Sequence, residues 1–246
     1  MTDQLIADEA LEEAPRALVR SRPDGWCGVR SLRVALEDGM TLSIEDFTWR
    51  GADMERFLND GLPPTALEVN AKRVNLSGGD SVGFAGLAGP SGLDLSLAVV
   101  WDEGRNFLDV RQIDVRSSNG DRLTLSAHID NVDLSSEAAM QMSATAWSVS
   151  KAVIGIGVGE ALQELVPGVD LSTLVSALPG DVLSSGSAAA ISQYNADGPQ
   201  GNLTFDVAAT PGLGPARFLP VFMSGLDPMD ASLWSGVALD IAFAPR

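Results

Sequence analysis

Hydrophobic and polar residues alternate along three consecutive segments in the middle of the chain. Between Leu93 and Leu134 apolar residues stand at every second position, and the turn-prone stretches DEGRN and SSNGD separate the segments. A period of two is typical of strands with one buried face, and short turns join such strands into an antiparallel meander. The parity changes between Val110 and Ile113, which predicts a β-bulge near Gln112.

The same alternation recurs on both sides of this meander. A hairpin is predicted where two alternating runs flank the turn Asp38-Gly39. The segment GADMERFLNDG follows this hairpin and predicts one helix that ends at Gly61, before the pair Pro63-Pro64. The alternating segments outside the meander are residues 32–36, 42–49, 67–76, 202–209 and 237–243.

Helices are predicted mainly after the meander. The composition shifts to Ala, Met and Ser beyond Ser135, which predicts a helix capped by Ser135 or Ser136 and continuing through Trp147 to Lys151. The stretches EALQELV and DLSTLVSAL predict two further short helices within a helical region of about 136–178. Residues 215–226 also favour a helix, and Asp227-Pro228 predicts a cap with proline at the first position of another.

The order of these elements indicates the fold class. Strands, then helices, then strands occur without regular βαβ alternation, so we expect an α+β fold with a mainly antiparallel, curved β-sheet covered by several short helices. Residues 3–21 favour a helix interrupted by Pro15. We therefore expect an N-terminal helical arm at 1–25 and a single β-rich domain at 26–246, because 246 residues suffice for a core without disulfides or metals.

Charge narrows the classes of partner. The chain has 33 acidic and 16 basic residues, a net charge of −17, and such a surface repels phosphate backbones. Nucleic acid is therefore not an expected partner. The same charge opposes attraction to anionic headgroups but leaves an apolar groove free to hold a lipid tail.

No residue pattern predicts catalysis. Gly155, Gly157 and Gly159 lack the spacing of a dinucleotide-binding loop and fit close packing or a helix end. His128 is the only histidine and Cys27 the only cysteine, so neither a zinc site nor a disulfide framework is expected, and no G-x-S-x-G motif supplies a nucleophile. We predict no catalytic, cofactor-binding or metal-binding residue and no cofactor.

The remaining candidate residues fit ordinary structural roles. Asp102-Glu103 and the pair Asp130 and Asp133 lie outside any calcium-loop pattern and are expected to be solvated loop acids. The five tryptophans stand at strand or helix positions and are expected in the core.

The chain also lacks membrane-spanning and export signals. The start MTDQLIADEALEEAPRALVRSR is acidic where a signal peptide is basic, and the longest apolar run, Ala152 to Val158, is too short to span a bilayer. We expect no transmembrane segment. We expect the protein to be periplasmic or in the cell envelope if a leader was removed, and otherwise cytoplasmic.

Several segments in order carry a resemblance to a group of bacterial proteins. DGWCG, Thr48-Trp49, DGLPP, SAHIDNVDLSS and FLPVFMSGLDP together resemble uncharacterised alphaproteobacterial envelope proteins, distant relatives of AsmA-like and tubular lipid-binding β proteins. The resemblance implies an elongated antiparallel sheet, a periplasmic setting and an apolar groove.

Three functions follow as hypotheses. The first is a non-enzymatic envelope protein that binds a lipid or other amphiphile or acts as a scaffold, with Met140 and Met142 as adaptable apolar contacts. The second is a cytosolic protein-interaction or assembly module. The third is an unrecognised hydrolase, which would require a serine close to His128 in the fold.

Overall fold

The fold is given by a computed structural model. It describes residues 19–36, 39–78, 88–89, 91–158, 175–176, 178–179, 181–197, 201–224, 227 and 230–245.

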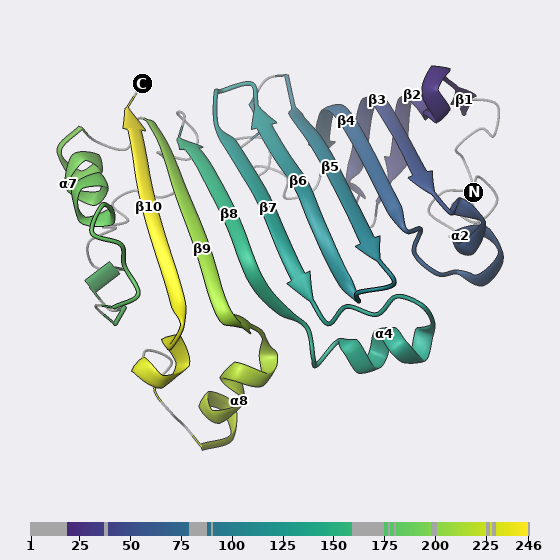
Figure 1. The fold of residues 1–246 in the computed structure, drawn as a ribbon. Coiled ribbons are helices and arrows are strands. Elements are labelled where there is room, and N and C mark those ends of the chain that lie inside the picture. The colour runs from purple at the N-terminus through teal and green to yellow at the C-terminus, as the bar shows by residue number, and fades with distance from the viewer. Residues whose placement is uncertain are drawn as a thin grey trace.

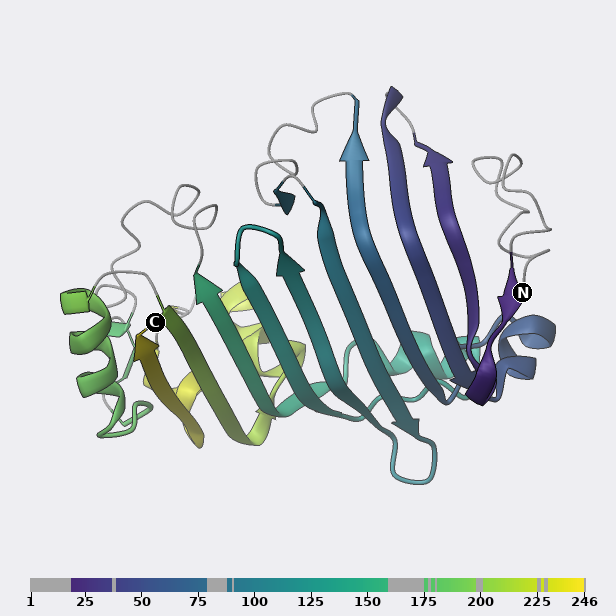
Figure 2. The same ribbon diagram turned by 90° about the horizontal axis from the view of Figure 1, so that it is seen from above.

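Ten strands form one antiparallel sheet whose spatial order is the order of the chain (Figure 1). Figure 2 shows them as a single twisted layer. The sheet is not closed, because β1 and β10 are its two edges. The strands are β1 Arg20–Ser21, β2 Cys27–Ala35, β3 Thr41–Ala52, β4 Ala66–Ser77, β5 Leu93–Asp102, β6 Phe107–Ser117, β7 Arg122–Asp130, β8 Ser148–Val158, β9 Gly201–Leu213 and β10 Val237–Pro245.

Three of the described helices lie at one end of this sheet. Helices α2 (Met54–Asp60), α4 (Glu137–Ser143) and α8 (Pro215–Ser224) follow β3, β7 and β9 (Figure 1). Since neighbouring strands reverse direction, connections after these strands all lie at the same end, with the 3₁₀ turn Ala231–Trp234. Helix α7 (Ser187–Asp197) follows β8 and packs along β10.

Local sequence explains several element ends. Helix α2 ends at Gly61, whose φ of 68° is the left-handed conformation that glycine adopts without strain. Helix α4 is capped by Ser136, whose side chain accepts a hydrogen bond from the amide of Ala139 at 3.1 Å. The pairing register shifts between Val110 and Ile113, so the predicted bulge near Gln112 is confirmed.

Much of the predicted architecture is confirmed. The hairpin, the central meander, the helix closed by Gly61, the strand after it and the last two strands are all present. The expected α+β class with a mainly antiparallel sheet is the class observed.

The predicted helical region at 136–178 is wrong over part of its length. Helix α4 ends at Ser143, and Ser148–Val158 is strand β8 at the middle of the C-terminal half of the sheet. The branched side chains of this segment suit a pleated sheet better than a helix, and its glycines are strand residues. The predicted helix EALQELV lies outside the described residues; of DLSTLVSAL the structure describes residues 175–176, which are helical, and residue 178, which is not.

The predictions near the two ends of the chain are tested only in part. Within the predicted helical arm, Arg20–Ser21 is a strand and Pro23–Gly25 a 3₁₀ turn, while residues 1–18 lie outside the described residues. After α8, the 3₁₀ turn Ala231–Trp234 is capped by Asp230, which accepts hydrogen bonds from Ser232, whereas the helix start predicted at Asp227-Pro228 lies partly outside the described residues.

Candidate functional site

The strongest candidate is a continuous apolar face of the sheet. Paired residues on neighbouring antiparallel strands point to the same side, and apolar residues pair with apolar residues from β3 to β10. In the centre of the sheet these residues are Leu93, Leu95, Leu97, Val99, Trp101, Leu108, Val110, Ile113, Val115, Leu123, Leu125, Ala127, Ile129, Val149, Ala152, Ile154 and Ile156.

The bulges keep this face continuous. In β6 the apolar positions change parity from Val110 to Ile113, and the register shifts at the same place, so Val110 pairs with Ala127 and Ile113 with Leu125. Without the extra residue, one half of the strand would turn its apolar side chains to the opposite face. The bulge therefore preserves one apolar side along the whole strand.

Side chains at the centre of this face are less buried than those of a packed core. Trp101 and Val110 are buried, but Leu125, Ile113 and Ile154 are only half-buried. Leu123 is 42% exposed. A second layer of structure normally removes such side chains from water. The centre of the sheet thus presents apolar surface that remains partly accessible.

The C-terminal side of the face is covered by the chain itself. Ile191 of α7 packs with Leu203 and Ile241, and the ring of Tyr194 lies 5.5 Å from that of Phe243 in an edge-on arrangement. Among the described helices, α7 is the one that packs along a strand. The apolar face is therefore closed over β9 and β10 and more open toward β5–β8.

The outer edge of β10 is covered as well. The amide of Leu239 donates to the carbonyl of Val182 at 2.7 Å, and the amide of Ser184 donates back to the carbonyl of Leu239 at 3.0 Å. The Ser187 hydroxyl, fully buried, accepts a hydrogen bond from the amide of Ile241 at 2.9 Å. These contacts satisfy backbone groups that an open edge would leave free.

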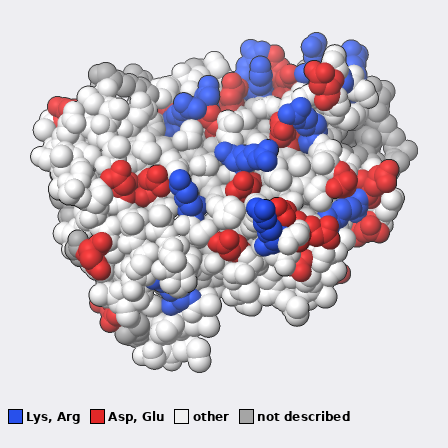
Figure 3. All heavy atoms as spheres, viewed as in Figure 1, with Lys and Arg blue, Asp and Glu red and all other residues white. Residues whose placement is uncertain are grey.

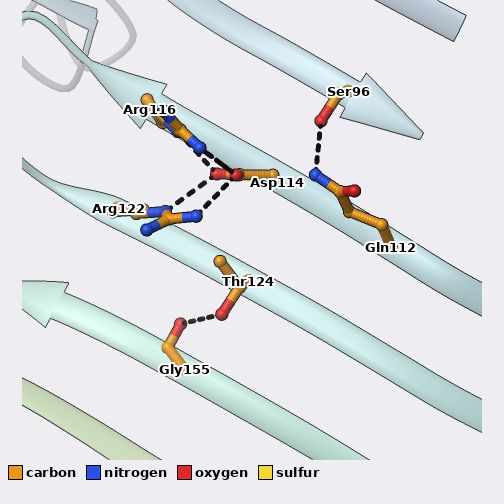
Figure 4. Close-up of polar contacts among 7 residues, drawn as sticks. All are labelled: Ser96, Gln112, Asp114, Arg116, Arg122, Thr124 and Gly155. Carbon is orange, nitrogen blue, oxygen red and sulfur yellow. Dashed lines mark hydrogen bonds and ion pairs between the residues drawn. The ribbon is translucent and has the colours of Figure 1, made fainter. Parts of the chain in front are cut away.

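The opposite face of the sheet is polar and carries a compact charge cluster (Figure 4). Asp114 of β6 is 3% exposed and accepts paired hydrogen bonds from Arg116 and from Arg122 of β7, the shortest 2.6 and 2.7 Å. Hydrogen bonds from Arg116 first, and then Arg122, hold the pKa of Asp114 well below its usual range. The buried carboxylate is fully matched within the chain, which indicates a structural role.

Further ion pairs are distributed over this face. Figure 3 shows acidic and basic side chains intermixed on the side of the sheet turned to the viewer in Figure 1. Arg50 binds Glu68 at 2.7 Å, which raises the pKa of Arg50, and Arg22 pairs with Asp46. Because charges of both signs are intermixed, this face is well solvated and does not favour a ligand of one charge over the other.

His128 lies on the polar face between two carboxylates. Its Nδ1 is 2.9 Å from Asp109 and its Nε2 is 3.4 Å from Asp130, and its ring lies 4.4 Å from that of Phe107. Both ring nitrogens face carboxylates, so none of these contacts presents a serine hydroxyl for activation. Among the residues that the structure describes, no cluster of His, Cys, Asp and Glu could hold a metal ion.

The predicted glycine series is divided by the structure. Gly155 and Gly157 lie inside β8, on the polar face, and Gly159 lies outside the described residues. A Cβ at Gly155 would overlap the hydroxyl of Thr124, which donates to the Gly155 carbonyl at 3.4 Å. These two glycines allow close packing within a sheet and do not form a phosphate-binding loop.

Other residues singled out in the sequence are dispersed. Cys27 is a half-buried free thiol at the start of β2. Asp102 caps the following turn by accepting a hydrogen bond from the amide of Arg105. Asp130 lies beside the ring of His128, and Asp133 accepts a hydrogen bond from the amide of Ser135. Asp130 is therefore a strand residue and not the loop acid that was expected.

The tryptophans and methionines also separate by environment. Trp49 and Trp101 are buried as predicted, but Trp147 is 37% exposed, so its assignment to the core is wrong. Met140 is half-buried and Met142 is 74% exposed on α4, at an end of the sheet. Neither methionine is placed over the centre of the sheet by its helix.

Comparison with known proteins finds no family model, no curated protein and no solved structure that matches the chain. Within the described part of the chain, the helices are too short or too polar to cross a bilayer.

Proposed function

We propose that this chain is a non-enzymatic protein that binds an amphiphile, with the apolar part of the ligand lying across the centre of the apolar face. The observation that carries the proposal is the pairing of apolar residues across β5–β8 whose side chains, apart from the buried Trp101 and Val110, are only partly buried; Leu123 is the most exposed of them. Contiguous exposed apolar surface marks interaction or ligand sites in soluble proteins.

The dimensions of the face favour a lipid-like chain. Strands lie about 4.8 Å apart, so β5–β8 span roughly 15 Å and the ten strands roughly 40 Å. One leaflet of a bilayer has a hydrocarbon thickness of about 15 Å. A single acyl chain therefore fits the less covered part of the face. The resemblance to envelope proteins makes a periplasmic setting part of this proposal.

Native mass spectrometry of the purified protein, followed by organic extraction, tests the proposal directly. We expect a reproducible extra mass that extracts as lipid. A mass equal to that of the chain alone, together with no binding of a fluorescent C16 fatty acid, would overturn the proposal. Oligomers or a bound protein in the same native mass spectra would then favour the assembly role.

Two variants on the same strand provide a matched comparison. Leu123→Glu places a charge on the apolar face, whereas Ser126→Glu places the same charge on the polar face of β7. Transfer of a carboxylate into contact with an acyl chain is costly, so we expect Leu123→Glu to weaken fatty-acid binding by at least about tenfold and Ser126→Glu to leave it unchanged. Equal effects of both variants, with unchanged circular dichroism, would argue against binding on this face.

A further inference from the structure

Helix α8 presents large apolar side chains to solvent at one end of the sheet. Phe222 and Met223 are each 81% exposed, and Leu219 is 49% exposed. These positions are spaced by three and four residues, so the three side chains form one stripe along the helix. Phe222 and Met223 are nearly twice as exposed as Leu123, the most exposed of the large apolar residues in the strands at 42%.

The helix itself is firmly attached, so this stripe is held outward. The ring of Phe218 lies 6.4 Å from that of Trp234 in an edge-on arrangement. The guanidinium of Arg217 donates to the carbonyl of Pro211 at 2.7 Å and to the carbonyl of Ser235. These contacts join α8 to the end of β9 and to the turn before β10.

The size of the stripe distinguishes between two classes of partner. Three side chains with these exposures present roughly 400 Å² of apolar surface. A stable protein interface needs about 800 Å² from each partner. A lipid surface has no such requirement, because it accepts single apolar side chains at the boundary between headgroups and acyl chains.

Charge selects the kind of lipid surface. Arg217, the one basic residue of α8, uses its guanidinium on backbone carbonyls and is not directed at a headgroup. The chain as a whole has a net charge of −17, which is repelled by anionic lipids. The apolar stripe therefore suits headgroups without net charge.

We propose that α8 docks the protein on a bilayer of zwitterionic lipids by inserting Leu219, Phe222 and Met223. Trp234, which contacts α8 through Phe218, also packs on the cluster of Val182, Ala209 and Val237 at the covered side of the apolar face. Docking through α8 thus sets the end of the sheet against the lipid surface. A role of this docking in transferring a lipid to the sheet rests on the proposed function. The docking itself does not depend on it.

Flotation with vesicles tests docking in the absence of any cargo. The full chain is mixed with phosphatidylcholine vesicles, or with vesicles containing phosphatidylglycerol, at low and high salt. We expect the protein to float with phosphatidylcholine and to bind the phosphatidylglycerol vesicles more weakly at low salt. The double variant F222S/M223S should reduce binding to phosphatidylcholine by at least about tenfold.

The control variant is Leu36→Ser, which removes an exposed leucine after β2, at the other end of the sheet. It should leave flotation unchanged. Unchanged flotation of F222S/M223S, no flotation of the unmodified chain, or tighter binding to phosphatidylglycerol would each overturn the docking proposal.

Fatty-acid binding in solution separates this proposal from the proposed function. F222S/M223S should retain binding of the fluorescent C16 fatty acid, because it leaves the sheet unchanged, while Leu123→Glu should retain flotation. If neither the unmodified chain nor its variants bind the fatty acid, while the unmodified chain floats as expected, the amphiphile site alone is refuted. Loss of flotation in Leu123→Glu, with unchanged circular dichroism, would refute docking through α8 alone.

Discussion

The guanidinium of Arg56 on α2 lies over the indole ring of Trp101 on β5, 4.8 Å from the ring centre. Trp101 also donates from Nε1 to the carbonyl of Val132 at 2.8 Å, and Arg56 donates to the carbonyl of Leu134 at 2.7 Å. These two side chains therefore join the connections after β3 and β7 to the end of β5. One end of a single-layer sheet is held together by polar contacts around one buried indole.

Replacement of this indole should destabilise the fold. Trp101 is 3% exposed, and Trp101→Phe removes the Nε1 donor and weakens the cation–π contact with Arg56. We expect the free energy of unfolding to fall by about 1–3 kcal/mol, measured by urea denaturation. Trp147→Phe, at a 37% exposed indole, should change it by less than about 0.5 kcal/mol. Equal losses in the two variants would contradict the role given to Trp101.

Asp114 should make stability dependent on pH in the acid range. Its pKa is lowered in the folded protein, so its stabilisation is fully present above the unfolded value of about 3.9 and is lost as the pH falls below it. Asp114→Asn should lower the free energy of unfolding by about 1–3 kcal/mol at pH 7, because Arg116 and Arg122 lose their shared partner. This difference from the unmodified protein should shrink as the pH falls below 4.

Denaturant unfolding at a series of pH values measures this difference. The lowered pKa values of Asp133 and Asp230 act in both proteins and cancel in the comparison. Glu103→Gln removes the same charge from an exposed turn and should have no comparable effect. A difference between Asp114→Asn and the unmodified protein that stays constant from pH 7 to pH 2 would contradict the assignment.

Ser187→Ala should loosen the C-terminal edge of the sheet. The substitution leaves the buried amide of Ile241 without the oxygen that it now binds at 2.9 Å. We expect a loss of about 1–3 kcal/mol in the free energy of unfolding and faster hydrogen exchange at Ile241. Ser232→Ala, in the exposed turn before β10, serves as the control. Unchanged exchange at Ile241 would show that the hydroxyl does not protect this edge.

The sequence predicts those strands in which one face is apolar and the other polar. The meander from Leu93 to Leu134 and even its bulge follow from alternation alone, because a one-residue insertion is visible as a change of parity. Strand β8 was missed because Ala- and Met-rich residues precede it, and β1 was missed because two residues carry no period. Helix α7 has little amphipathic pattern, since alanines and serines occupy both its sides.

The candidate site could be predicted only in outline. Alternation places the apolar residues of each strand on one side, but it does not say whether a second layer covers them. The half-burial of Leu125 and the exposure of Leu123 depend on where α7 packs, which no local pattern specifies. The stripe Leu219, Phe222 and Met223 was visible as an apolar run in FLPVFMSGLDP, but the same run equally suits a buried helix.

The strand order of the sheet has a consequence for how the protein evolves and folds. Each strand pairs only with its predecessor and its successor in the chain, so every pairing joins consecutive strands and none has to bridge an intervening strand. Stability should then be distributed as a sum of neighbouring terms, as in repeat proteins. Insertion or deletion of one hairpin would lengthen or shorten the apolar face by about 10 Å without changing the remaining pairings. Under the proposed function, such a change would alter the length of the apolar ligand that the face can accommodate.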